Sequence, residues 1–124
     1  TDPTTDQLYT LFKSPGSYYW VAVEDEKVLG GCGIFPTDSL SEGCAELVKF
    51  YLDPRARGKG LGKQLMERCI EWAKDQGLKQ LYLESFPEFE TAIALYQRYG
   101  FEKLDQPLGN SGHYACNVWM LKTL

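Results

Sequence analysis

A chain of 124 residues and 14.1 kDa can bury one core but not two, so we predict a single domain over 1–124. The net charge of −4 and pI of about 5.0 argue against nucleic acid as the main partner, since a surface that follows phosphates usually makes a domain basic. No apolar run is long enough to cross a bilayer and no secretory signal opens the chain, which favours the cytoplasm and no membrane partner. The first residue is not methionine, so we expect residues upstream to be missing.

Three elements are predicted before residue 53. Apolar residues at helical spacing predict a short first helix over 5–13. The stretch "SYYWVAVEDEKVLGGCGIFP" contains two β-rich runs around the polar turn "EDEK", which is typical of a hairpin. After a loop over 37–43, "CAELVKFYL" (44–52) is predicted to be a strand that Asp53 and Pro54 end.

The second half alternates helices and strands. An apolar stripe predicts a helix from Gly60 to Gln76 with Gly77 as its C-terminal cap. A strand over 78–85 and a helix over 90–99 follow, and Gly100 ends that helix. Two strands, "FEKL" and "HYACNVWMLKTL", then flank the loop "DQPLGNSG". The order of elements predicts an α+β domain with a mixed sheet and no internal repeat.

The four cysteines are scattered, without a CxxC pair or a nearby histidine, and they are Cys32, Cys44, Cys69 and Cys116. This spacing argues against structural zinc, and we expect no metal. Isolated thiols pack well in cores, so we expect reduced and mostly buried cysteines.

The stretch "RARGKGLGK" (55–63) concentrates positive charge and glycine between a strand and a helix. The first N–H groups of a helix have no partner within it, and the positive end of the helix dipole lies behind them. Glycines at 58, 60 and 62 let a phosphate approach the backbone, while Arg57, Lys59 and Lys63 add positive charge. We therefore predict a small polyphosphate ligand at this turn, although a solvated basic turn remains the alternative.

Two common phosphate motifs do not fit. A Walker loop requires glycine where Arg57 stands and serine or threonine where Gln64 stands, and the G-x-G-x-x-G spacing of dinucleotide-binding folds is absent. The spacing Arg55-x-x-Gly58-x-Gly60 does resemble the pyrophosphate signature of the Gcn5-related N-acetyltransferases, the GNAT superfamily. A second segment, "AIALYQRYGFEKL", is similar to that family's late helix and following strand. The resemblance covers about residues 18–104.

The resemblance implies acetyl-coenzyme A as co-substrate and a mostly antiparallel sheet with a central parallel pair, splayed between the strands that hold Leu52 and Leu83. By the same analogy, the backbone of Phe50, Tyr51 and Leu52 pairs with the pantetheine arm. The pyrophosphate would lie on the turn and first residues of the helix, namely Arg57, Gly58, Lys59, Gly60, Leu61, Gly62 and Lys63.

Two residues are candidates for proton transfer. Strand alternation puts Glu46 on one face with Cys44, Val48, Phe50 and Leu52, where partial desolvation would raise its pKa toward that of a general base. An ordinary ion pair with a lysine is the alternative. Tyr96 occupies the family's usual position for the general acid; a buried core tyrosine is the alternative.

The sequence departs from the family pattern at two points. Many relatives carry an asparagine that contacts the pantetheine arm at the position where this chain has Phe89, and a phenylalanine cannot make the same polar contact. The strand that usually precedes the first helix is expected to be missing. Candidate acceptor-lining residues are aromatic, namely Trp20, Phe35, Phe86, Phe89 and Tyr114, whereas His113 is read as a polar edge residue.

These features predict an N-acetyltransferase that moves an acetyl group from acetyl-CoA to an amine of a small molecule or peptide by direct attack in a ternary complex. A non-catalytic acyl-CoA sensor on the same fold is the first alternative. A nucleic-acid-binding module that uses residues 55–63 is the second. Dimers are frequent among relatives, so a homodimer is compatible with the reading.

Overall fold

The computed structural model describes residues 8–14, 17–24, 26–36, 40–54, 60–108 and 117–124. Contacts divide the chain into two compact units. Unit 1 consists of Thr1–Phe35 and Leu47–Trp72, and unit 2 consists of Pro36–Glu46 and Ala73–Leu124. The hydrogen-bonded strand order is β1 (Leu8–Ser14), β2 (Ser17–Glu24), β3 (Lys27–Phe35), β4 (Cys44–Leu52), β5 (Gln80–Ser85), β7 (Val118–Thr123) and β6 (Glu102–Leu104). Strand β4 contributes residues to both units. The single domain over 1–124 stays a prediction.

Unit 1 begins with a strand where a helix was expected. Strand β1 (Leu8–Ser14) pairs antiparallel with β2 (Ser17–Glu24), so the predicted helix over 5–13 is wrong. Tyrosine, threonine and phenylalanine favour strands, and β2 provides pairing partners on both sides of an irregularity between Thr10 and Lys13. Ser14 and Ser17 form the last residue pair between the two strands.

The second hairpin is confirmed. Strand β2 pairs antiparallel with β3 (Lys27–Phe35), and Glu24↔Lys27 is the last residue pair before the turn. Glu26 in that turn has a φ of 64°, the left-handed conformation that tight hairpin turns require. A Cβ on Gly30 would lie 2.8 Å from the backbone oxygen of Tyr51, so glycine lets β3 approach the end of β4 closely.

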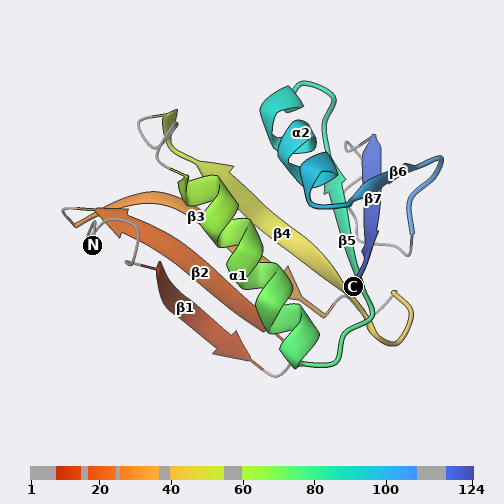
Figure 1. Ribbon diagram of the computed structural model, residues 1–124, viewed down its shortest axis with the longest axis horizontal. Coiled ribbons are helices and arrows are strands. Elements are labelled where there is room, and N and C mark those ends of the chain that lie inside the picture. Colours follow the sequence, from red (N-terminus) through yellow and green to blue (C-terminus); the bar gives the residue numbers. More distant parts are fainter. Residues whose placement is uncertain (1–7, 15–16, 25, 37–39, 55–59, 109–116) are drawn as a thin grey trace. The chain divides into compact units, whose positions relative to one another are not determined.

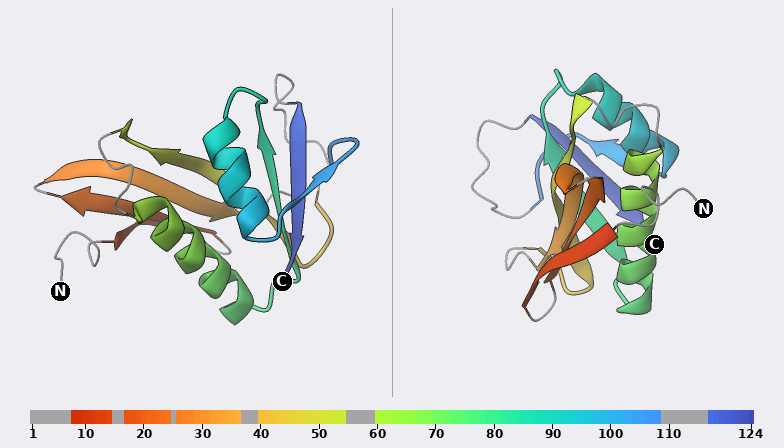
Figure 2. Two further views of the ribbon diagram at one scale, coloured as in Figure 1. Left: turned by 45° about the horizontal axis from the view of Figure 1, so that its top comes forward. Right: turned by 90° about the vertical axis from the view of Figure 1, so that its left-hand side faces the viewer.

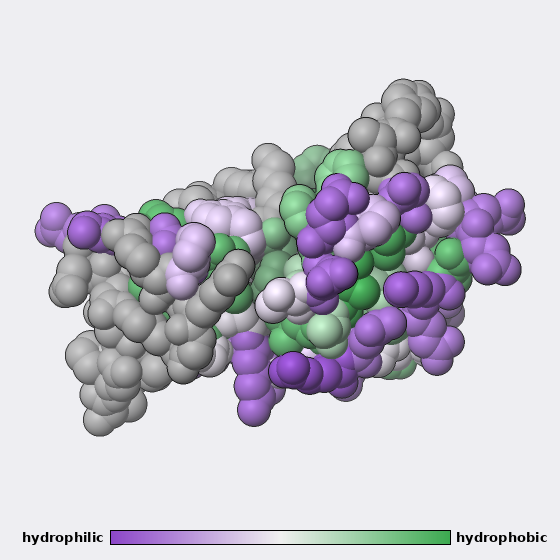
Figure 3. Space-filling model, turned by 90° about the horizontal axis from the view of Figure 1, so that it is seen from above, coloured by the Kyte–Doolittle hydropathy of each residue, from purple (hydrophilic) through white to green (hydrophobic). Residues whose placement is uncertain are grey.

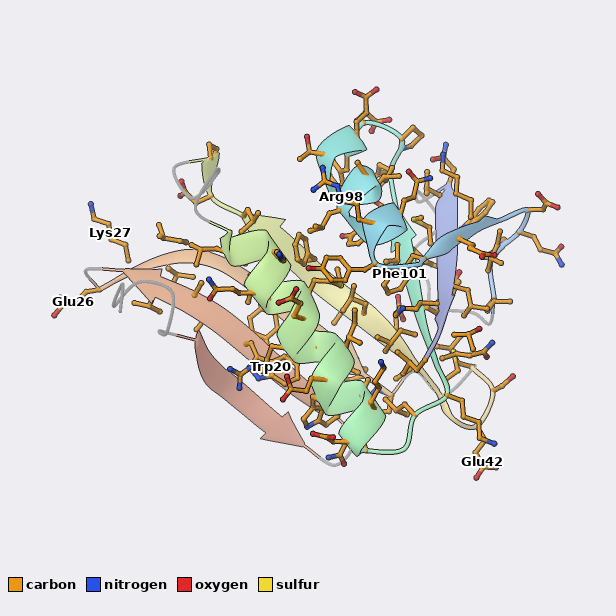
Figure 4. All side chains as sticks on the ribbon, in the orientation of Figure 1. Trp20, Glu26, Lys27, Glu42, Arg98 and Phe101 are labelled. Carbon is orange, nitrogen blue, oxygen red and sulfur yellow. The ribbon has the colours of Figure 1, made fainter. Side chains whose placement is uncertain are left out.

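Helix α1 (Leu61–Asp75) closes the core of unit 1, lying in front of β2 and β3 in Figure 1. Leu61 is buried in a cluster with Ala22 and Leu29, against which Leu52 packs. Further along the helix, the ring of Trp20, which is labelled in Figure 4, meets that of Trp72 edge to face with centroids 5.8 Å apart. These contacts confirm the apolar stripe read from the sequence, and Cys32 and Cys69 are buried free thiols, as expected.

Unit 2 contains the parallel pair. Residues 44–46 of β4 (Cys44–Leu52) pair in parallel with residues 80–82 of β5 (Gln80–Ser85), and β5 pairs antiparallel with β7 (Val118–Thr123). Strand β6 (Glu102–Leu104) borders β7. Helix α2 (Glu90–Arg98) lies on one side of β5 and β7 (Figures 1 and 2). The predicted α+β class, with a mostly antiparallel sheet around a parallel pair, is confirmed.

Both helices end at glycines in the left-handed conformation, as the sequence predicts. Gly77 has a φ of +79° and its N–H bonds to the carbonyl of Lys74 at 3.0 Å. Gly100 has a φ of +91°, and the next residue, Phe101, donates its N–H to the carbonyl of Tyr96 at 3.0 Å. Within the described residues, neither helix combines the length and apolar character that crossing a bilayer requires.

Candidate active site

The start of α1 offers backbone donors in unit 1. Gly60 precedes the helix with a φ of +74°, is exposed, and has no atom within 4 Å of where a Cβ would stand. The first hydrogen bond of the helix runs from the N–H of Gln64 to the carbonyl of Gly60 at 3.1 Å. The N–H groups of residues 61–63 therefore have no partner inside the helix. The first turn contains no acidic residue, and Lys63 is exposed there, so the electrostatics favour an anion.

Leu61 belongs to both the turn and the core. The residue is 1% exposed, and its side chain lies in the cluster with Ala22 and Leu29. Gly62, the next residue, is buried as well. Of the other residues predicted to hold the pyrophosphate, Arg57, Gly58 and Lys59 lie outside the described residues, as does Arg55 of the signature.

The end of β4 belongs to unit 1 as well. Tyr51 is 45% exposed, Phe50 and Leu52 are half-buried, and all three lie beyond the stretch of β4 that pairs with β5. The N–H of Asp53 donates to the carbonyl of Leu29 at 2.7 Å, which ties this end of the strand to β3. The arrangement agrees with a backbone edge for the pantetheine arm, and that role stays a proposal.

Glu46 is the buried carboxyl of β4, in unit 2. It is 3% exposed between Ala45 and Leu47, which are buried as well. Burial raises the pKa of the neighbouring Cys44 thiol, and the charge of Glu46 raises it further. This interaction agrees with the predicted alternation, which puts Cys44 and Glu46 on the same face.

The residue paired with Glu46 on the adjacent strand is not among the site residues predicted from the sequence. Tyr82 is the cross-strand partner of Glu46 and is 0% exposed. Its hydroxyl donates to the Glu84 carboxylate at 2.6 Å and accepts the N–H of Leu108 at 3.0 Å. Burial raises the pKa of Tyr82, and so do the hydrogen bond to Glu84 and the charges of Glu84 and Glu46, while the bond from Leu108 opposes them. Alternation in "LYLES" places Tyr82 and Glu84 on one face, but no local signal points to Leu108.

Tyr96, the predicted general acid, lies on α2 in unit 2. It is 6% exposed, and its ring meets that of Phe101 at a centroid distance of 5.9 Å; Figure 4 shows Phe101 beside the end of α2. Glu46 and Tyr96 thus belong to the same unit, whereas the described residues of the predicted cofactor site belong to unit 1.

An aromatic pair precedes α2. Phe89 occupies the N-cap position without a side-chain cap hydrogen bond, and its ring meets Phe86 edge to face at 5.4 Å. Phe89 is 54% exposed. More generally, hydrophobic side chains lie among hydrophilic ones on the face drawn in Figure 3. Trp20, by contrast, is 5% exposed against α1, while Tyr114 and His113 lie outside the described residues.

No group of three or more metal-ligating side chains occurs in the part of the chain that the structure describes.

Comparison with known proteins decides the family. Residues 1–101 match the model of the acetyltransferase (GNAT) family. The chain belongs to the GNAT family. It is 43% identical over 123 residues to the uncharacterized N-acetyltransferase YjgM of Escherichia coli (strain K12), covering 99% of this chain and 74% of that protein. It is 37% identical over 104 residues to N-acetyltransferase 8 of Homo sapiens, covering 82% of this chain but 46% of that protein.

Solved GNAT structures share the fold. An acetyltransferase of the GNAT family from Staphylococcus aureus Mu50 matches with a TM-score of 0.79 and 24% identity, over 88% of this chain and 69% of that chain. The PaiA N-acetyltransferase from Thermoplasma acidophilum, solved in complex with coenzyme A, matches with a TM-score of 0.69 and 21% identity, over 88% of this chain and 62% of that chain. The GNAT fold expected from the sequence is therefore confirmed.

Proposed function

We propose that this GNAT protein transfers an acetyl group from acetyl-CoA to an amine of a small molecule or peptide, by direct attack in a ternary complex. The observation that carries the proposal is the glycine-led start of α1. Backbone N–H groups without a partner inside the helix, an exposed lysine and no acidic residue occur there, at the position of the family's pyrophosphate signature. The coenzyme A complex of a structural neighbour supports a donor of this class.

Binding of the donor falls to unit 1. The N–H groups of residues 61–63 and the ammonium of Lys63 would hold the diphosphate, since a helix N-terminus stabilises negative charge. Tyr51 and Leu52 would present their backbone to the pantetheine arm. Arg57, Gly58 and Lys59 complete the proposed turn on sequence grounds.

Glu46 is proposed as the general base. An amine attacks a thioester only as the free base, and the attack releases a proton once the C–N bond forms. A carboxylate removed from bulk water is suited to accept that proton, directly or through one water. The neighbouring Cys44 and Tyr82 keep their protons, because their pKa values are raised, so they do not compete as bases.

Tyr96 is proposed as the general acid. Collapse of the tetrahedral adduct breaks the C–S bond and leaves a thiolate, which needs a proton or a hydrogen bond. A phenol has an ordinary pKa of about 10 and a thiol one of about 8.5, so Tyr96 would act through its position as donor to the sulfur. Its burial on α2 holds the ring in place.

A screen for thiol release tests the proposal. Acetyl-CoA is incubated with amino acids, polyamines, aminoglycosides and peptides, and free coenzyme A is measured. Turnover with at least one amine is expected; acetyl-CoA binding without turnover on any of them would favour a non-catalytic sensor.

Two substitutions then test the assigned roles. Glu46→Gln should lower kcat by about 100-fold or more, the usual contribution of a general base, while Glu71→Gln on the exposed side of α1 should not. Tyr96→Phe should lower kcat. Tyr99→Phe, at the C-cap of α2, should leave kcat within about twofold of the parent value. An unchanged pH–rate profile in Glu46→Gln would place the base elsewhere.

A further inference from the structure

Tyr82 is a buried phenol whose hydroxyl connects two distant parts of unit 2. It donates to Glu84, two residues along the same strand, and accepts from the backbone of Leu108, 26 residues further on. The oxygen therefore has its proton directed at Glu84 and a lone pair at Leu108. Because both are engaged within the protein, the hydroxyl serves as a tether and not as a proton donor to substrate.

The tether lies on the face that carries Glu46. Glu46 and Tyr82 are cross-strand partners in the parallel pairing, and side chains of such partners project from the same face of a sheet. The charge of Glu46 also acts on the Tyr82 phenol. Leu108, held at the Tyr82 hydroxyl, is therefore held over the face from which Glu46 projects.

The tethered segment, residues 105–108, contains a second constraint. Asp105, Gln106 and Pro107 are exposed, whereas Leu108 is half-buried, so burial of the segment begins at the tether. Pro107 has a fixed φ and comes directly before the bonded amide. The hydrogen bond at Leu108 thus holds the amide that follows a residue with restricted φ.

We propose that Tyr82 is a positioning residue for the acceptor: its hydroxyl holds segment 105–108 over the sheet face beside Glu46, where the amine is to be deprotonated. The inference rests on the proposed function. Tyr82, Leu108 and Glu46 all belong to unit 2, whereas the described residues proposed to hold the diphosphate and the pantetheine arm belong to unit 1. Loss of the tether therefore affects acceptor binding and leaves donor binding unchanged.

The test is Tyr82→Phe, which removes one oxygen and keeps the buried ring. The KM for the best amine of the screen should rise about 3- to 10-fold, the range that corresponds to the loss of one hydrogen bond, with the KM for acetyl-CoA and kcat within about twofold. The matched control is Tyr19→Phe, which deletes the hydroxyl of another buried tyrosine in unit 1 and should leave the acceptor KM unchanged. Hydrogen exchange at the Leu108 amide should be slow in the parent protein and faster in Tyr82→Phe only.

Three other results would each overturn the inference, and the last would overturn the proposed function as well. An acceptor KM that stays constant while Leu108 exchanges faster would show a tether without a positioning role and overturn the inference alone. Acceptor and acetyl-CoA KM values that rise together would reduce Tyr82 to support of the fold and also overturn it. No turnover by the parent protein with any amine would overturn the proposed function, and the positioning role with it.

Discussion

Replacing Gly60 with aspartate tests the anion site at the start of α1 directly. Nothing lies within 4 Å of where the new Cβ would stand, so the substitution causes no steric clash. The φ of +74° disfavours most side chains but is among the conformations that aspartate and asparagine tolerate best. The main consequence of Gly60→Asp is therefore a carboxylate placed beside the proposed diphosphate.

The expected loss of affinity follows from Coulomb's law. Two like charges about 5 Å apart repel by about 1–3 kcal/mol at the effective dielectric constants of protein surfaces, so the Kd for acetyl-CoA should rise about 5- to 150-fold. Isothermal titration calorimetry at two salt concentrations measures it, and the loss should shrink at high salt, since exposed charges are screened.

Two controls separate charge from backbone strain. Gly60→Asn has the same shape and strain without the charge, and should weaken binding much less. Gly77→Asp puts the same side chain at the other end of α1, where φ is +79° and the space around the Cβ is also open. It should leave the Kd unchanged. Equal affinities for Gly60→Asp and Gly60→Asn would refute the assignment of the phosphate to this turn.

Two further predictions concern unit 1. Gly31→Ala should destabilise the protein by about 1–3 kcal/mol, because the added Cβ would lie 2.9 Å from Cζ of Tyr19 and 3.1 Å from the Tyr51 ring. Urea unfolding measures the loss, and a midpoint equal to that of the parent protein would contradict the prediction. Burial, followed by the charges of Tyr51, Cys32 and Cys69, raises the pKa of Tyr19 to about 12. The folded state thus keeps a proton that the unfolded state loses near pH 10, so stability should fall as pH rises from about 10 to 12, and less steeply in Tyr19→Phe.

Local signals predicted most of the fold where they agreed with one another. Gly77 and Gly100 each follow an apolar stripe at helical spacing, and both end a helix in the left-handed conformation. The strand predicted over 44–52, with Asp53 and Pro54 as its end, has the same bounds as β4. In each case the boundary is marked by a residue with unusual backbone preferences: glycine, which tolerates a positive φ, or proline, which lacks an N–H.

The wrong prediction of a first helix has a physical cause as well. Residues 5–13 carry apolar side chains that satisfy helical spacing, but the same residues have good strand propensity, and the partner strand β2 decided between the two. A propensity cannot report such a partner, because the partner lies elsewhere in the chain.

The candidate site was predictable only in part. Glu46 follows from its position among apolar neighbours of a strand, and its burial was expected. The bond between Tyr82 and Leu108 joins residues 26 positions apart and involves a backbone amide, which has no sequence signature. Only the folded chain brings the two residues together.

Leu61 joins the stability of unit 1 to its proposed ligand. Its side chain fills the core beside Ala22 and Leu29, while its amide belongs to the turn that would hold the diphosphate. A ligand that binds only the folded turn must raise the unfolding temperature, in proportion to RT ln(1 + [L]/Kd). By the same linkage, a substitution that loosens the packing beneath Leu61 would weaken coenzyme binding from a distance, without removing a single contact to the nucleotide.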